Sequence, residues 1–273
     1  MREQQLPPDY RSTLRAAAAD LAAARRVLVI TGAGISADSG LPVYRGVGGL
    51  YDGDDTEDGV PIETALSGAM LRQRPELTWK HLLQIARAGV GCEPNAAHHA
   101  LARMEASGRF AGFTVLTQNV DSFHHAAGSR DVIEVHGDLR QLHCRACGYD
   151  APMPDPRGLD GPPACPCCAA LMRPSIVLFG ESLPAAAITR YEQVLEQGVD
   201  LVMVVGTSAG FPYIAGPVAQ AARQGLPTIE INPARSEVSY LVRHRLAVRA
   251  AVALPDLCAE IAPQRCPAPL PAF

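Results

Sequence analysis

Short runs of apolar, often β-branched residues recur along the chain and predict β-strands. Several of these runs are almost continuously hydrophobic, which is typical of parallel strands buried on both faces. The predicted strands cover residues 26–30, 113–118, 132–137, 175–180, 200–208 and 228–232.

The stretches between these runs carry helix signals. Residues 95–108 begin with Asn95 and end at Gly108, residues that commonly start and stop a helix. Further helices are predicted at 8–25, 184–197 and 213–224. The alternation of strands and helices predicts an α/β fold with a doubly wound parallel sheet of the Rossmann type.

Two regions interrupt this alternation. Residues 46–94 combine a loop rich in Gly and Asp with helices, and residues 141–172 are rich in Cys, Pro and Gly. We expect both to be insertions that pack together as a smaller module. The predicted boundaries give a nucleotide-binding domain of 1–45, 96–140 and 173–273, and a small domain of 46–95 and 141–172.

Composition narrows the class of protein. The chain has 273 residues, of which 48% are hydrophobic, enough for one large domain with an insert. A formal net charge of −4 argues against nucleic-acid binding through general positive charge. The chain has no apolar run of bilayer length, and its N-terminus lacks the apolar core of a signal peptide. We therefore expect a cytoplasmic protein that does not bind membranes.

The cysteines form the most specific pattern. Four of the eight follow the spacing C-x₂-C-x₁₇-C-x₂-C, namely Cys144, Cys147, Cys165 and Cys168. Four thiolates close a tetrahedron around zinc and leave no position for water, so the predicted site is structural. The alternative is a set of reduced, unliganded thiols.

Other side chains near these pairs are weaker candidates. Cys167 is expected to be a spare thiol, and His143 is an alternative ligand that the four cysteines make unnecessary. Cys92, Cys258 and Cys266 are expected to be inert, although the sequence does not decide whether any of these thiols has a redox role.

A glycine-rich loop follows the first strand. Gly32, Gly34 and Ala37 form the pattern G-x-G-x-x-A, in which small residues let the backbone approach a pyrophosphate. Such loops also serve as plain strand-to-helix turns. The loop runs on to Arg45, and no acidic residue that could hold a ribose ends the next strand, since Asp52, Asp54 and Asp55 lie in a loop.

Polar side chains follow three other strands. Gln118, Asn119 and Asp121 suit ribose hydroxyls and a carboxamide, and Thr207, Ser208 and Asn232 suit an adenosine or cap the next helix. His136 follows a short strand and is a candidate general base, because a neutral imidazole accepts protons near neutral pH. A structural histidine is the alternative.

Taken in order, these motifs resemble those of the sirtuin family of NAD-dependent protein-lysine deacylases. The motifs are GAGISADSGLPVYRG, TQNVDSFHHAAG, EVHGDL, the two C-x₂-C pairs, RPSIVLFGE, VVGTS and INP, and the match runs from about Arg26 to Pro255. The loop resembles that of the bacterial and mitochondrial branch. The resemblance implies a Rossmann-type domain, a small domain built from a zinc ribbon and a helical insert, and a cleft between them for NAD and an acyl-lysine peptide.

The resemblance also implies residue roles. His136 matches the catalytic base, and Asn119 and Asp121 match further residues of the catalytic site. Val177, Phe179 and Gly180 resemble the strand that pairs with the substrate peptide. The implied NAD-binding residues are Gly32, Ala33, Gly34, Ile35, Ala37, Tyr44, Arg45, Gln118, Asn119, Asp121, Gly206, Thr207, Ser208, Asn232 and Ala250.

The family mechanism follows from the same resemblance. The acyl-lysine carbonyl oxygen attacks the anomeric carbon of the nicotinamide ribose and expels nicotinamide. The base, here His136, then deprotonates a ribose hydroxyl, which attacks the resulting imidate. The products are free lysine, nicotinamide and O-acyl-ADP-ribose.

Two departures from the family pattern concern specificity. Tyr44 stands where relatives often have Phe. Leu82 and Ile85 stand where relatives that prefer malonyl- or succinyl-lysine carry Tyr and Arg. An apolar pair cannot compensate a buried carboxylate, so we expect acetyl or longer apolar acyl groups to be preferred.

Two alternatives to deacylation use the same sequence features. One is mono-ADP-ribosyl transfer or NAD hydrolysis in the same cleft. The other is a zinc-stabilised module that senses NAD without turnover, which a complete set of catalytic residues disfavours. The sequence does not determine the target proteins or the oligomeric state.

Overall fold

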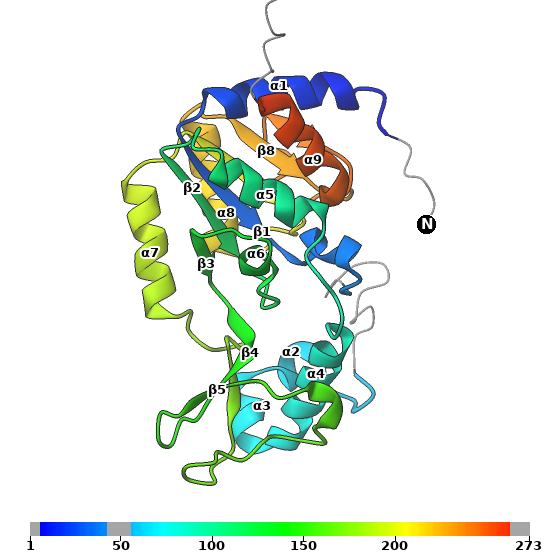
Figure 1. The fold of residues 1–273 in the computed structure, drawn as a ribbon, viewed down its shortest axis with the longest axis vertical. Coiled ribbons are helices and arrows are strands. Elements are labelled where there is room, and N and C mark those ends of the chain that lie inside the picture. Colours follow the sequence, from blue (N-terminus) through cyan, green and yellow to red (C-terminus); the bar gives the residue numbers. More distant parts are fainter. Residues whose placement is uncertain (1–5, 43–55, 263–273) are drawn as a thin grey trace, which may run out of the picture.

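The computed structural model describes residues 6–42 and 56–262. Figure 1 shows a larger body that contains a sheet flanked by helices, and a smaller module that is joined to it near strand β4. The predictions for six residues lie outside the described residues, namely Tyr44, Arg45, Asp52, Asp54, Asp55 and Cys266.

The larger body is built on a parallel sheet of six strands within the described residues. Its order is β3-β2-β1-β7-β8-β9, and all neighbours run parallel. This confirms the predicted Rossmann-type sheet. The strand order changes direction at β1 and β7, and ligands of such sheets bind at the carboxyl ends of the strands there. The strands are β1 (Arg26–Thr31), β2 (Gly112–Thr117), β3 (Val132–Glu134), β7 (Leu201–Val205), β8 (Thr228–Ile231) and β9 (His244–Leu246).

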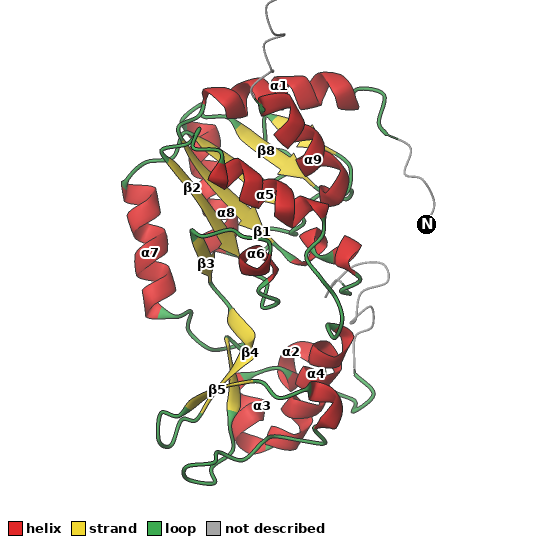
Figure 2. Ribbon diagram, viewed as in Figure 1, coloured by secondary structure: helices red, strands yellow, loops and turns green. Residues whose placement is uncertain are grey.

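Helices cover both faces of this sheet (Figure 2). Alternate residues of β1 point to opposite faces: Val27 and Val29 join one hydrophobic cluster, and Leu28 and Ile30 join the other. The first cluster includes α1 (Tyr10–Ala23), α5 (Ala96–Ala106) and α9 (Ala250–Ile261), and the second includes α7 (Ala185–Glu196) and α8 (Pro212–Arg223). The four helices predicted from sequence are therefore present, each within two residues of its expected start and end.

Within the described residues, the smaller module combines two short helices and one of 14 residues with an antiparallel sheet of order β5-β4-β6. Trp79 is fully buried, packs with Leu142 and Met172, and donates its indole N–H to the Met172 carbonyl at 3.2 Å. Residues of the two predicted insertions thus share one hydrophobic cluster, while the exact domain boundaries stay a prediction. The elements are α2 (Ile62–Ala65), α3 (Gly68–Gln73), α4 (Pro75–Ala88), β4 (Gly137–His143), β5 (Asp150–Pro152) and β6 (Arg173–Ile176).

The strand predicted at 175–180 is shifted and belongs to the smaller sheet. β6 covers 173–176 and pairs with β4, and the chain beyond Val177 is held elsewhere. The N–H of Phe179 donates to the Leu66 carbonyl, and the Phe179 carbonyl accepts from Gly68, each at 3.0 Å. The backbone of this segment therefore pairs with the α2–α3 connection rather than with a strand.

The strand predicted at 132–137 is also divided. β3 ends at Glu134, and β4 of the other sheet begins at Gly137, which has φ +79°. A Cβ at this position would lie 2.0 Å from the Ser175 carbonyl oxygen, so only glycine fits. His136 consequently lies at the junction between the two sheets.

The sequence prediction missed two elements near the C-terminus, β9 and α9. β9 has only three residues, too few to show a period. Pro255 lies inside α9, and an internal proline is a strong signal against a helix. Tertiary packing overrides that signal, since Ala253, Leu254 and Leu257 are fully buried against the sheet.

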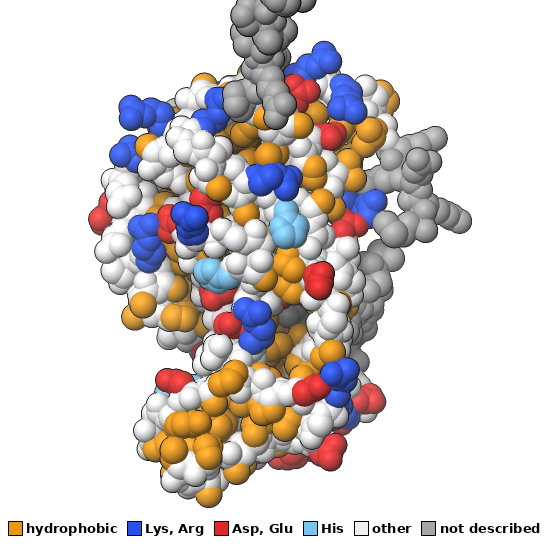
Figure 3. Space-filling view, viewed as in Figure 1, with side chains coloured by type: hydrophobic (Ala, Val, Ile, Leu, Met, Phe, Trp, Pro, Cys, Tyr) orange, Lys and Arg blue, Asp and Glu red, His pale blue; other side chains and the backbone are white. Residues whose placement is uncertain are grey.

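Charged side chains of both signs are interspersed on the face shown in Figure 3, where hydrophobic side chains gather mainly on the smaller module. Among the helices of residues 6–42 and 56–262, none has the length and apolar character needed to span a bilayer.

Candidate active site and zinc centre

A cavity of about 560 Å³ lies between the loop after β1 and the smaller module. One wall comes from Ala33, Ser36 and Leu41, and the opposite wall from Ile85 and the ribbon residues near Pro154. The segment after β2 closes its floor through Asn119, Val120 and Asp121. The cavity therefore opens at the switch point of the sheet, where ligands of this fold bind.

The predicted glycines make close backbone contacts at this point. A Cβ on Gly32 would lie 2.7 Å from the Thr207 Cβ, and one on Gly34 would lie 2.8 Å from the Gly206 Cα. The N–H of Gly34 donates to the Gly206 carbonyl at 2.8 Å. Close packing between the loops after β1 and β7 thus requires glycine even before any ligand is considered.

A hydrogen-bonded network links three strand ends. The side-chain amide of Gln118 donates to the Thr207 hydroxyl at 2.8 Å and to the Thr31 carbonyl at 3.3 Å. The Asn232 amide donates to the Thr207 carbonyl at 3.0 Å. The structure therefore brings together Gln118, Thr207 and Asn232, which were predicted separately from three motifs.

Asn119 and Asp121 meet at Ser36 of the glycine loop. The Asn119 amide donates to the Ser36 hydroxyl at 3.1 Å, and this hydroxyl donates to the Asp121 carboxylate at 2.7 Å. Burial raises the pKa of Asp121, although hydrogen bonds from Phe123 and Ser36 act in the opposite direction. Asn119 is buried, so its amide is held in one orientation beneath the cavity.

Hydrogen bonds on both nitrogens fix the His136 imidazole. Its Nδ1 lies 2.8 Å from the Gln118 carbonyl oxygen, and its Nε2 lies 2.7 Å from the Tyr213 hydroxyl. A carbonyl can only accept, so Nδ1 carries the proton and Nε2 of the neutral ring accepts from Tyr213. Burial lowers the pKa of His136, although the Gln118 carbonyl acts in the opposite direction. Near neutral pH the ring is a neutral base with its lone pair on Nε2.

Two aromatic residues next to His136 were not predicted from the sequence. Phe211 and Tyr213 stack with ring centroids 5.4 Å apart, and both meet the His136 ring edge-to-face. Phe211 is 42% exposed, which is unusual for a large hydrophobic side chain beside a buried polar site. The available signal was the pair of aromatics directly after GTSAG, at a strand end that the fold directs toward the site.

The predicted peptide-binding segment is attached to the same histidine. The N–H of Val177 donates to the His136 carbonyl at 2.9 Å. Glu181 fixes the other end, since its carboxylate accepts from both terminal nitrogens of Arg173, at 2.7 and 2.8 Å, and from the Leu178 N–H at 3.0 Å. Phe179 is 40% exposed between these anchors.

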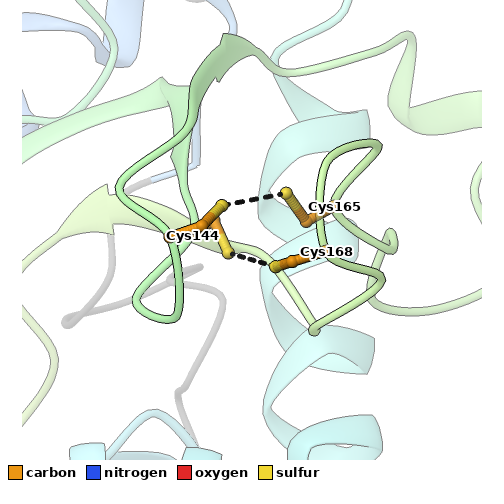
Figure 4. Close-up of side chains that lie close together, drawn as sticks. Cys144, Cys165 and Cys168 are labelled. Atoms are coloured by element: carbon orange, nitrogen blue, oxygen red, sulfur yellow. Dashed lines mark hydrogen bonds between the residues drawn. The ribbon is translucent and has the colours of Figure 1, made fainter.

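The four predicted zinc ligands converge. The sulfurs of Cys144, Cys147, Cys165 and Cys168 all lie within 4.8 Å of one another, with Cys144–Cys168 at 3.5 Å and Cys147–Cys165 at 3.6 Å. In a tetrahedron with Zn–S bonds of about 2.3 Å, two sulfurs are about 3.8 Å apart. Figure 4 shows Cys165 and Cys168 facing Cys144 across the site. Number, type and spacing of these donors all fit a structural zinc ion.

Backbone N–H groups lower the pKa of two of the four thiols, those of Cys144 and Cys165. N–H groups of Cys147 and Ala146 lower the pKa of Cys144, against the effect of burial. For Cys165, burial opposes ionisation, but N–H groups of Cys167 and Cys168 lower its pKa to about 7. Thiolates are the form that binds zinc, so both effects favour metal binding.

The other cysteines of the described residues lie outside this cluster, as does His143. Cys167 is exposed and is not one of the four converging sulfurs, and His143 bonds Asp150 at 2.7 Å. Cys92 lines the cavity, and Cys258 packs against the core of the larger body.

Several predicted contact residues have buried side chains. Ile35 and Ala250 belong to the hydrophobic core, so they can meet a ligand only through backbone atoms. Leu82 is 1% exposed and packs inside the smaller module, whereas Ile85, one turn further along α4, lines the cavity.

Ala37 begins a short 3₁₀ turn, and Ser208 is exposed. His136 itself does not line the cavity. Its Nδ1 contacts the Gln118 carbonyl, and the residues that follow Gln118, from Asn119 to Asp121, line the cavity.

Comparisons with known proteins identify the class to which this fold and site belong. The model of the Sir2 family matches residues 32–211. The chain is 44% identical over 261 residues to NAD-dependent protein deacylase 2 of Pseudomonas aeruginosa, covering 93% of this chain and 99% of that protein. It is 48% identical over 249 residues to the protein of the same name from Pseudomonas syringae pv. tomato, covering 90% and 99%.

A solved structure agrees with these relatives. A Sir2 variant in complex with a deacetylated p53 peptide and 3′-O-acetyl-ADP-ribose superposes with a TM-score of 0.80, at 26% identity, covering 90% of this chain and 98% of that one. The chain belongs to the Sir2 family.

Proposed function

We propose that the chain is an NAD-dependent protein-lysine deacylase that releases nicotinamide and O-acyl-ADP-ribose. The observation that carries the proposal is the fixed imidazole of His136. Its Nδ1 is tied to Gln118, its basic Nε2 is directed away from that bond, and its own carbonyl holds the Val177 segment. His136 therefore supplies the proposed base through its side chain and anchors the proposed peptide-binding segment through its backbone carbonyl.

NAD is the proposed co-substrate, and the strand-end network supplies its binding groups. Thr207 and Asn232 are proposed to hold the adenosine side, and Gln118, Asn119 and Asp121 the nicotinamide ribose and carboxamide. The hydrogen bonds among these residues orient their amides before any ligand binds. The glycine loop, from Gly32 through Ala33 and Gly34 to Arg45, is proposed to enclose the phosphates.

His136 acts as general base in this proposal. Its neutral ring accepts a proton at Nε2 from a ribose hydroxyl, while the Gln118 carbonyl stabilises the imidazolium that forms. Asn119 and Asp121 are proposed to position the ribose. Both side chains are hydrogen-bonded to the Ser36 hydroxyl, which holds them in place. Hydrogen bonds from Ser36 and Phe123 offset part of the cost of burying the Asp121 carboxylate.

The acyl-lysine substrate is a peptide or protein segment. We propose that its backbone lies along Val177, Phe179 and Gly180, a segment whose far end the Arg173–Glu181 pair anchors. Zinc is proposed to have no part in the chemistry. Four cysteine ligands leave no open position, so the ion would stabilise the module that carries one wall of the cavity.

An acyl-peptide assay tests the proposal. The enzyme, an acetyl-lysine peptide and NAD are incubated, and mass spectrometry follows the peptide and O-acetyl-ADP-ribose. We expect loss of the acetyl group only when NAD is present, and a fall of about 10²–10⁴-fold in kcat for His136→Ala. ADP-ribosylated peptide, or free ADP-ribose without deacylation, would instead support the transferase or hydrolase alternative.

The predicted cytoplasmic location remains a prediction. Fractionation of cells that express the full chain tests it.

A further inference from the structure

The Tyr213 hydroxyl is hydrogen-bonded to Nε2 of His136, the atom that accepts the proton when the histidine acts as a base. Nδ1 is protonated because it faces the Gln118 carbonyl at 2.8 Å, so the lone pair of the neutral ring lies on Nε2. The Tyr213 hydroxyl donates to that lone pair at 2.7 Å. An imidazole nitrogen has a single lone pair in the ring plane and accepts one strong hydrogen bond.

We propose that Tyr213 is a positioning residue that holds Nε2 of His136 before substrate binds, and that a substrate hydroxyl must displace it. This inference rests on the proposed function, in which that hydroxyl belongs to the nicotinamide ribose. Tyr213 and the ribose hydroxyl compete for one lone pair, so the tyrosine sets both the basicity of His136 and part of the cost of binding NAD.

The surroundings of Tyr213 allow both states. Its backbone is fixed at the start of α8, where its carbonyl accepts from the Tyr191 hydroxyl at 2.9 Å. Its ring stacks on Phe211, which is 42% exposed, so the stacked pair borders solvent on the Phe211 side. Burial raises the pKa of Tyr213 to about 12, and the phenol therefore remains a donor throughout the working pH range.

The hydrogen bond has a defined effect on His136. A donor to Nε2 stabilises the neutral ring and opposes its protonation, so removing the hydroxyl raises the pKa of the histidine. Removing the competitor also strengthens NAD binding, by about three- to tenfold for one neutral hydrogen bond. A residue with only a packing role would change neither quantity.

The test compares Tyr213→Phe with Tyr240→Phe. Tyr240 is 79% exposed and lies outside the site, so its variant controls for loss of a phenol. NMR follows the His136 imidazole during a pH titration without substrate, and steady-state kinetics give kcat and the KM for NAD. For Tyr213→Phe we expect the pKa of His136 to rise by about half a unit or more, the KM for NAD to fall about threefold, and kcat to stay within about twofold.

Two results would overturn the inference. One is an unchanged pKa of His136 in Tyr213→Phe. The other is a fall in kcat of about tenfold or more, which would place the hydroxyl in the chemical step. The titration needs no turnover, so it tests the Tyr213–His136 bond even if deacylation is absent and the proposed function fails.

A measurement on the wild-type chain covers the case in which the variant does not fold. The ¹⁵N shift of His136 Nε2 reports its hydrogen-bond donor. We expect this shift to move when NAD is added and Tyr213 is displaced. A shift that does not move at saturating NAD contradicts displacement.

Discussion

The side-chain amide of Gln118 donates a hydrogen bond of 2.8 Å to the hydroxyl of Thr207. These residues follow β2 and β7, which lie on either side of β1 and do not touch as strands. The bond therefore joins the segments that follow β2 and β7 across the carboxyl end of β1. It positions the amide that we propose to meet NAD.

Replacing Thr207 by Val tests this arrangement. Valine keeps the shape but removes the acceptor for Gln118 and for the Ala209 N–H, so we expect a loss of about 1–2 kcal/mol in the free energy of unfolding. Because the Gln118 amide loses the acceptor that orients it, we also expect the Kd for NAD to rise at least about fivefold. Urea unfolding and calorimetry measure the two effects. Thr189→Val, on the exposed side of α7, is the control and should change neither. Unchanged NAD affinity would limit Thr207 to a structural role.

The zinc prediction has a matched pair of variants. Cys165→Ser removes one of four converging sulfurs, whereas Cys167→Ser removes an exposed thiol two residues away. We expect one zinc per chain in the wild type and in Cys167→Ser, and loss of most of the metal from Cys165→Ser. Elemental analysis measures the content, and hydrogen exchange should show opening of residues 141–172 in the Cys165 variant. Equal zinc in all three proteins would contradict the assignment.

Stability should fall in acid because two histidines are buried neutral. His98 and His124 pack with ring centroids 5.1 Å apart, and burial lowers their pKa values to about 4 and about 3. The unfolded chain binds these protons near pH 6.5 and the folded chain does not. Stability is therefore fully present above about pH 6.5 and is lost as the pH falls toward 4, by about 3 kcal/mol for each histidine.

Urea unfolding at pH 7, 5.5 and 4.5 measures this dependence. Asp121 and Glu134 act in the opposite sense, because their raised pKa values favour the folded state in acid. The lowered pKa of His136 adds to the loss caused by His98 and His124. His98→Gln should flatten the slope, and His99→Gln, on the exposed side of the same helix, should leave it unchanged. A free energy of unfolding that does not fall between pH 7 and 4.5 would refute the prediction.

We expect acyl selectivity to depend on one position of α4. Ile85 lines the cavity, whereas Leu82 is buried in the module, so a substitution at 85 changes the acyl environment with least damage to the fold. We expect succinyl-lysine peptides to have a kcat/KM about tenfold or more below that of acetyl-lysine peptides, because an unpaired carboxylate is costly to bury.

Ile85→Arg should raise kcat/KM for succinyl peptides by supplying a charge partner, and Ile85→Gln, similar in length but neutral, should not. Arg140 also lines the cavity, but it already pairs with Asp138 at 3.5 Å. Comparable turnover of succinyl and acetyl peptides by the wild type would show that Arg140 or another group accepts the carboxylate.

The sequence by itself determined the parts whose signals are local. Hydrophobic runs located the core strands, and the cysteine spacing located the zinc ligands, since two C-x₂-C turns fix their own geometry. The order of the motifs pointed to His136 and to the strand-end residues. Even the reason for the glycines was only partly visible, because the contact of Gly34 with Gly206 appears only when β1 and β7 lie side by side.

Tertiary structure decided the relationships between distant segments. It moved the strand expected at 175–180 into the smaller sheet, because Phe179 pairs with the α2–α3 connection. It buried Leu82 and left Ile85 facing the cavity. The spacing of the two residues along the helix does not tell which of them faces the cavity. It also placed Tyr213 on the basic nitrogen of His136, 77 residues away in the chain. No local pattern encodes that contact, because it depends on how α8 and the β3–β4 junction pack around a shared sheet.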